Sequence, residues 1–194
     1  MAEIALTKIE TAMRQLDTAI WLWFNEGDIV SVVQLTGAAF GVLDDLFHHE
    51  KLARPMPFSE AFAPEGMKTR DARNLLKAAQ VFAKHARTDP DQTQEYRDDF
   101  AAGYLFLAVG ALNLLMQASL PGLRSLFNLW YGITYPDHFN TPRIAFLSPK
   151  DRVKVNRLKK LSRIEFFKET GGEFVGNPPR YKWYESPLGH IKSS

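Results

Sequence analysis

The segment LTKIETAMRQLDTAIWLWFNEGDIVSVV, residues 6–33, decides the fold class. Apolar side chains recur in it at intervals of three and four residues, at Ile9, Met13, Leu16, Ile20 and Trp23. Because an α-helix has 3.6 residues per turn, this spacing places them on one helix face. Thr7 followed by Glu10 is typical of a capping box, so the helix is expected to begin there.

A second helix is expected directly after the first. NEGD, residues 25–28, ends the first helix, and Asp28 can cap a helix over residues 29–52. The buried side of that helix is predicted to consist of Val32, Leu35, Ala39, Val42, Leu43 and Leu46. The two helices together predict an antiparallel hairpin.

Three further helical patterns follow along the chain. Residues 67–86 carry an apolar stripe opposite a basic face, and residues 100–120 contain no charged side chain. Residues 120–140 contain a fifth helix that ends at Tyr135-Pro136, with its inward side at Leu123, Leu126, Phe127 and Trp130. We therefore predict an all-α helical bundle of about five helices over residues 4–140.

The uncharged segment is long enough to span a membrane. Polar Tyr104, Asn113 and Gln117 are spread along it, and the neighbouring amphipathic helices need an apolar surface to pack on. We expect a buried central helix and no membrane association. The N-terminus lacks the pattern of a secretory signal and the chain has no Cys, so a cytoplasmic protein is expected.

Residues 148–194 form a second region, a basic helical extension with a Pro-rich and aromatic tail. The region has 11 Lys and Arg against 5 Asp and Glu, a net charge of +6, whereas the rest of the chain has a net charge of −4. Ser148 and Pro149 are suited to start a helix, which is expected to continue to Gly171-Gly172. An acidic body with a basic extension favours docking of the extension on its own chain or on a partner.

The basic extension could also bind nucleic acid. Its cationic side chains could neutralise phosphates, and the nucleic-acid-binding candidates are Lys154, Arg157, Lys159, Lys160 and Arg163. Tyr181, Trp183 and Tyr184 in the tail could stack on bases.

A metal site is the second alternative. In DDLFHHE, each Asp lies four residues before a His, so the candidate ligands are Asp44, Asp45, His48 and His49. A dinuclear site in a bundle needs a second ligand set on other helices, and no matching Glu-x-x-His occurs. An ordinary helix end accounts for these residues, and no metal or other cofactor is expected.

FAKHARTDPDQT, residues 82–93, holds the catalytic candidates Lys84, His85 and Arg87. Pro90 disfavours helical geometry at the preceding residue, so these cations are expected in the last turn of a helix. Cations are favourable there because of the helix dipole. The sequence therefore favours a structural explanation over catalysis.

Residues 8–46, VFAKHARTDPD at 81–91 and LFNLWYGITYPDHF at 126–139 resemble uncharacterised bacterial all-helical proteins related to the HEPN superfamily. The resemblance implies a helical bundle that is often dimeric, and a ribonuclease in those members that place an Arg roughly four to six residues before a His. None of the five His residues here has that Arg, so the activity is not expected. The leading hypothesis is a non-enzymatic interaction protein acting as a homodimer or with a protein partner. The alternative is an RNA-binding protein or an RNase-like enzyme of the HEPN type that uses Lys84, His85 and Arg87.

Overall fold

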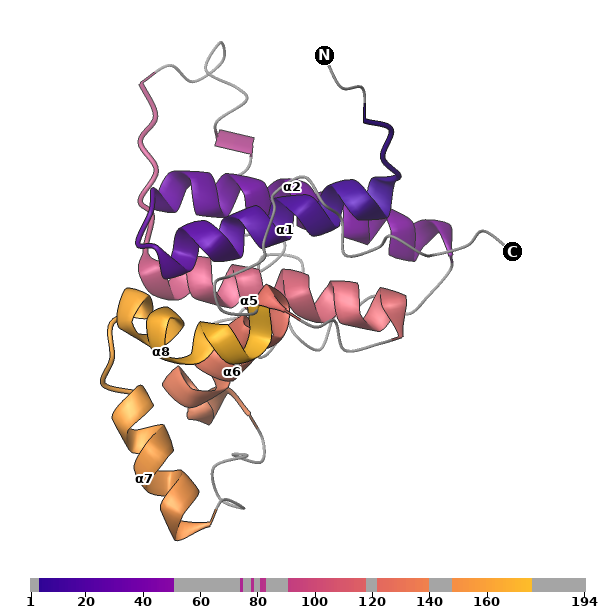
Figure 1. The fold of residues 1–194 in the computed structure, drawn as a ribbon. Helices are drawn as coiled ribbons and strands as arrows, with labels where there is room; N and C mark the ends of the chain where they lie inside the picture. The colour runs from indigo at the N-terminus through magenta and orange to yellow at the C-terminus, as the bar shows by residue number, and fades with distance from the viewer. Residues whose placement is uncertain are drawn as a thin grey trace.

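The computed structural model describes residues 4–50, 74, 78, 81–82, 91–117, 122–139 and 148–175. Every regular element within these residues is a helix, which confirms the all-α helical bundle (Figure 1). The elements are α1 (Lys8–Phe24), α2 (Ile29–His49), α5 (Asp98–Met116), α6 (Leu123–Thr134), the 3-10 helix η1 (Pro136–His138), α7 (Pro149–Leu158) and α8 (Arg163–Val175). Most of the helix predicted over residues 67–86, and the tail after residue 175, lie outside the described residues.

Local hydrogen bonds define the α1–α2 hairpin. The Thr7 hydroxyl accepts a hydrogen bond from the backbone N–H of Glu10, and the Glu10 carboxylate accepts one from the backbone of Thr7, as the capping box predicts. Asp28 accepts from the backbone N–H of Ser31 at 2.8 Å and so caps α2. Between the helices, Glu26 adopts a left-handed conformation with φ of 51°. This conformation lets the chain reverse direction within three residues.

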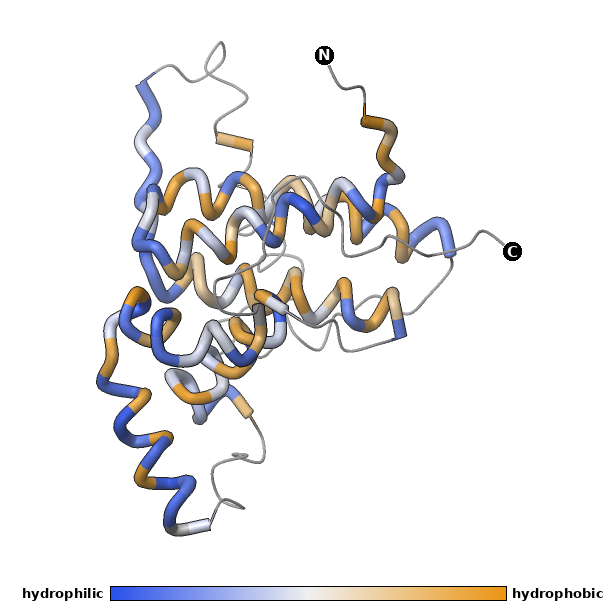
Figure 2. Tube along the Cα trace, viewed as in Figure 1, coloured by the Kyte–Doolittle hydropathy of each residue, from blue (hydrophilic) through white to orange (hydrophobic). Residues whose placement is uncertain are grey.

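Helix α5 is the element around which the bundle is built. It contacts α1, α2 and α6, and most of its side chains from Ala101 to Leu112 are buried. Figure 2 shows α5 as a largely hydrophobic segment running beside α1 and α2. An uncharged helix of this kind is stable in water only when other helices cover its sides.

The buried face of α2 agrees with the prediction at Val32, Ala39 and Leu43, but Leu35, Val42 and Leu46 are only half-buried. The residues buried in their place are Val33, Thr36, Gly37 and Phe47.

A cluster of aromatic rings joins the bundle to α8. The Phe24 ring stacks on Phe166 of α8, with ring centroids 6.0 Å apart, and packs edge-on against Phe127 of α6. Trp23 and Trp130 make an edge-to-face contact at 5.3 Å. Such pairs add to the stabilisation that burial of the rings provides. The cluster therefore fixes α8 against the junction of α1 and α6.

The C-terminal region contains two helices instead of the single predicted one. The helix is interrupted between Leu158, where α7 ends, and Arg163, where α8 begins. Gly171 and Gly172 lie within α8 instead of ending it. The Ser162 hydroxyl accepts from the backbone N–H of Glu165, and the Glu165 carboxylate accepts from the backbone of Ser162. SRIE, residues 162–165, is thus a capping box that starts a new helix.

Two described helices, α2 and α5, are long and apolar enough to cross a membrane by length and composition. Burial differs between them: 56% of the apolar window of α5 is buried inside the bundle, against 33% for α2. The core helix of a soluble protein passes the same test of length and composition. The burial of α5 therefore fits the expected role of a core helix.

Replacing Phe24 by Ala is expected to destabilise the protein by about 3–5 kcal/mol. The side chain is completely buried, so its removal loses apolar burial and leaves a cavity. Urea denaturation followed by circular dichroism would measure the change. Leu114→Ala on α5 is the control, because the Leu114 side chain is 49% exposed and should change stability by only about 0.5 kcal/mol. Equal losses for the two variants would contradict this packing.

We also expect the protein to be recovered in buffer without detergent. Helix α5 buries much of its apolar surface against α1, α2 and α6, so less apolar surface remains to contact lipid. Ultracentrifugation of a cell lysate, followed by immunoblotting of both fractions, would test this. Recovery in the membrane fraction that resists a high-salt wash would contradict it.

Candidate functional site

One end of the bundle carries a concentration of exposed carboxylates, which we call the acidic end. It comprises Glu26 and Asp28 between α1 and α2, Asp98 and Asp99 in the first turn of α5, and Asp91 and Glu95 on the segment that leads into α5. The α1–α2 turn and the start of α5 lie at this same end (Figure 1). The Arg163 guanidinium connects them, because it lies 4.1 Å from the centroid of the Trp23 ring and 3.4 Å from an oxygen of Asp98.

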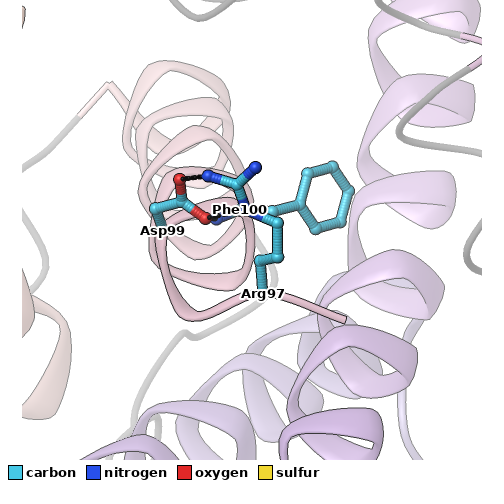
Figure 3. Close-up of polar contacts among 3 residues, drawn as sticks. All are labelled: Arg97, Asp99 and Phe100. Atoms are coloured by element: carbon cyan, nitrogen blue, oxygen red, sulfur yellow. Dashed lines mark hydrogen bonds and ion pairs between the residues drawn. The ribbon is translucent and has the colours of Figure 1, made fainter. Parts of the chain in front are cut away.

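Arg97 offsets part of the negative charge of the acidic end. Arg97 donates a hydrogen bond to Asp99 from Nε at 3.0 Å and a second one from Nη2 (Figure 3). These hydrogen bonds hold the pKa of Asp99 below its usual range. The pKa of Tyr135 is raised, first by burial and then by the nearby carboxylates of Asp99 and Asp98.

Helix α7 carries the opposite charge on its outward side, which we call the basic face. The buried Leu158 and half-buried Val155 mark the side of α7 that turns toward the protein. Lys150, Val153, Lys154 and Lys160 are exposed and make up the basic face. Figures 1 and 2 show α7 projecting from the bundle as a mainly hydrophilic helix.

The five predicted nucleic-acid-binding residues divide into two groups. Arg157 forms an ion pair with Glu169 of α8, and Arg163 contacts Asp98 and Trp23. These two arginines attach α7 to α8, and α8 to the bundle. Lys154, Lys159 and Lys160 are exposed and form no ion pair within the described part of the chain. The lysines, and Lys150 with them, are thus the side chains positioned to meet another molecule.

Charge is divided between the two regions of the chain. Residues 1–147 contain 17 Asp and Glu against 13 Lys and Arg, a net charge of −4. Residues 148–175 contain 8 Lys and Arg against 4 Asp and Glu, a net charge of +4. The two regions meet where Arg163 contacts Asp98.

The four metal-ligand candidates lie at the end of α2. Asp45, His48 and His49 are exposed, and the His49 ring contacts the neighbouring Glu50 at 3.1 Å. Across the described ranges, no three His, Cys, Asp or Glu side chains gather in a way that could hold a metal ion. The catalytic candidates Lys84, His85 and Arg87 lie outside the described residues.

A hydrogen bond between Tyr131 and His138 fixes the chain after α6. The Tyr131 hydroxyl and Nδ1 of His138 are 2.8 Å apart, and the Tyr135 ring stacks on the His138 ring. Burial raises the pKa of Tyr131, so its hydroxyl stays protonated. The segment YPDH, residues 135–138, therefore packs back on the end of α6.

The sequence analysis missed a buried ion pair between Asp17 of α1 and Arg124 of α6. Nε of Arg124 donates to Oδ1 of Asp17 at 2.7 Å and Nη2 donates to Oδ2 at 3.0 Å, with 4% of the Arg124 side chain and 7% of the Asp17 side chain exposed. Nη1 of Arg124 has no hydrogen-bond partner in the described structure. The sequence signal that could have found this ion pair is a single charged residue within each of two apolar helix faces. Asp17 follows Leu16 in α1, and Arg124 follows Leu123 in α6.

Comparison of the chain with protein-family models, curated proteins and solved structures gives no match. The resemblance to HEPN-related proteins therefore stays a prediction.

Replacing Arg124 by Met should destabilise the protein by about 3–5 kcal/mol, because it leaves the Asp17 carboxylate buried without its partner. The double variant D17L/R124M should recover most of this loss, since an apolar pair of similar volume avoids burying charge. Urea denaturation of both variants is the measurement. A double variant as unstable as R124M would mean that packing, and not the unpaired charge, causes the loss.

Proposed function

We propose that the chain is a cytoplasmic, non-enzymatic interaction protein that works through homodimer or protein-partner contacts. The observation that carries this proposal is the basic face of α7. Its lysines are exposed and unpaired within the described residues, while Arg157 and Arg163 nearby are used to attach α7 and α8. A helix that is attached at one end and exposed along its outer side is suited to contact another molecule.

The composition of the basic face supports a protein as that molecule. Val153 lies at its centre and is 71% exposed, the highest value among the large exposed apolar residues described. Apolar side chains surrounded by charged ones are typical of protein–protein interfaces, in which an apolar centre is enclosed by a polar rim. A surface that contacts only phosphates gains nothing from such a side chain.

RNA binding is the second candidate function. It is favoured by Lys150, Lys154, Lys159 and Lys160, which present four cationic groups along one helix and the turn after it. The acidic end works against this function, because it contacts the first residue of α8, the helix that follows α7, and repels a polyanion. We therefore place protein binding first.

Photo-crosslinking from position 153 in cells would test the proposal. In one variant of the full-length chain, a photoreactive amino acid replaces Val153. In a second variant it replaces Leu114, which is 49% exposed on α5. We expect a discrete protein–protein product from position 153 and none from position 114, because only the first lies on the basic face. Gel electrophoresis and mass spectrometry would identify the product.

Two outcomes would contradict the proposal. The first is the absence of any protein product from position 153. The second is tight binding of a labelled single-stranded RNA, measured by fluorescence anisotropy, that weakens steeply with salt and disappears in K150E/K154E/K160E. Such binding would identify α7 as an RNA-binding helix, because its salt dependence reports released counterions.

A further inference from the structure

We infer that the partner of the basic face is the acidic end of a second copy of the same chain. The inference rests on the proposed function and names its partner. Two copies would exchange contacts, so that α7 of each copy lies against the α1–α2 turn and the start of α5 of the other. Four observations support this arrangement.

The first observation is charge complementarity. Residues 1–147 have a net charge of −4 and residues 148–175 have a net charge of +4. Glu26, Asp91 and Glu95 are exposed and form no ion pair within the described residues, as is also true of Lys150, Lys154 and Lys160. Three unpaired anions and three unpaired cations are therefore available to meet between two copies. Charges of this kind steer association and fix its orientation.

The second observation is a matching apolar contact. Val153 lies at the centre of the basic face and is 71% exposed. Val30 lies in the first turn of α2, two residues after Asp28, and is 38% exposed. Each charged surface thus contains one exposed valine, and the two can be buried against each other while the charges pair around them.

The third observation is that the two surfaces are neighbours on one chain. Lys160 is three residues before Arg163, which contacts Asp98 of the acidic end. When two complementary surfaces lie side by side, a two-fold rotation brings each onto its counterpart and closes the assembly as a dimer. Surfaces on opposite sides of the chain would instead give a head-to-tail ring or an open filament. Helix α7 is only about 15 Å long, at 1.5 Å per residue, so a single α7 contact buries little surface. In a two-fold dimer the same contact forms twice, which doubles the buried surface.

The fourth observation is the backbone of Glu26. Its φ of 51° lies in the left-handed region, where Gly avoids the steric cost that a side chain incurs. Residues held in such conformations are often found at functional sites. A contact between the Glu26 carboxylate and a lysine of the second copy would give this side chain a role that Gly could not fill.

Analytical ultracentrifugation of the full-length protein would test the inference. We expect the wild type to reach twice the 22.1 kDa mass of the chain at micromolar concentrations, and to dissociate as salt is raised. The variants K150E/K154E/K160E and E26K/D91K/E95K should each dimerise at least about tenfold more weakly, because every changed side chain now repels its counterpart. The matched control D45K/E50K changes exposed carboxylates at the other end of α2 and should dimerise as the wild type does.

Mixing the two charge-reversed variants gives the decisive measurement. An equimolar mixture restores one attractive set of contacts, so a heterodimer should form where neither variant alone dimerises. The crosslink from position 153 should also map to a peptide of the α1–α2 turn when the wild-type protein is used.

Three results would overturn the inference. They are a wild type that stays monomeric at all concentrations, a dimer that neither charge reversal weakens, and a mixture that does not associate. A crosslink from position 153 to a different protein, together with a monomeric wild type, would remove the second copy as the partner while leaving the proposed function intact.

Discussion

The ion pair between Asp17 and Arg124 sets the relation between α1 and α6, on which the remaining arrangement depends. The two guanidinium–carboxylate hydrogen bonds are 2.7 and 3.0 Å long and lie in the interior of the bundle. A buried charge without its partner is costly, so α1 cannot slide or rotate along α6 without a large loss of stability. Apolar contacts alone tolerate such shifts better, since they are not directional.

The alignment of α1 with α6 determines where the C-terminal helices can bind. It brings Phe24, Trp23 and Trp130 together at one end, and α8 packs on these rings through Phe166 and Arg163. Helix α7 is then held by its last turn, through the buried Leu158 and the ion pair of Arg157. The core thus places a basic helix beside a group of carboxylates, and the proposed interaction surfaces follow from that placement.

The sequence was sufficient for features that depend on neighbouring residues. Helix periods and the caps at Thr7 and Asp28 are encoded within a few positions, and the structure contains both caps. The ion pair joins residues 107 positions apart, and no local pattern specifies which charges meet at that distance. The break at Ser162 was different, because SRIE is a recognisable capping box that the continuous apolar stripe around Leu158 and Leu161 obscured.

The candidate surfaces show the same division between local and non-local information. The sequence indicated a basic extension, but it could not separate Lys154, Lys159 and Lys160 from the arginines that are paired within the chain. That distinction depends on whether an acidic side chain from another helix lies within reach. Position in space also decides which carboxylates act together, because the α1–α2 turn and the start of α5 are far apart in sequence and lie at the same end of the bundle (Figure 1).

Local charge, and not the net charge of +2, governs how such a protein associates. At physiological ionic strength the Debye length is about 8 Å, so a partner approaching α7 experiences the lysines there and little of the distant charges. A small net charge reduces the general repulsion between copies of a protein. With separate acidic and basic surfaces, the attraction that remains is directional, because contacts between like surfaces are repulsive and contacts between unlike surfaces are attractive. Charge separation therefore favours one defined pairing over non-specific aggregation.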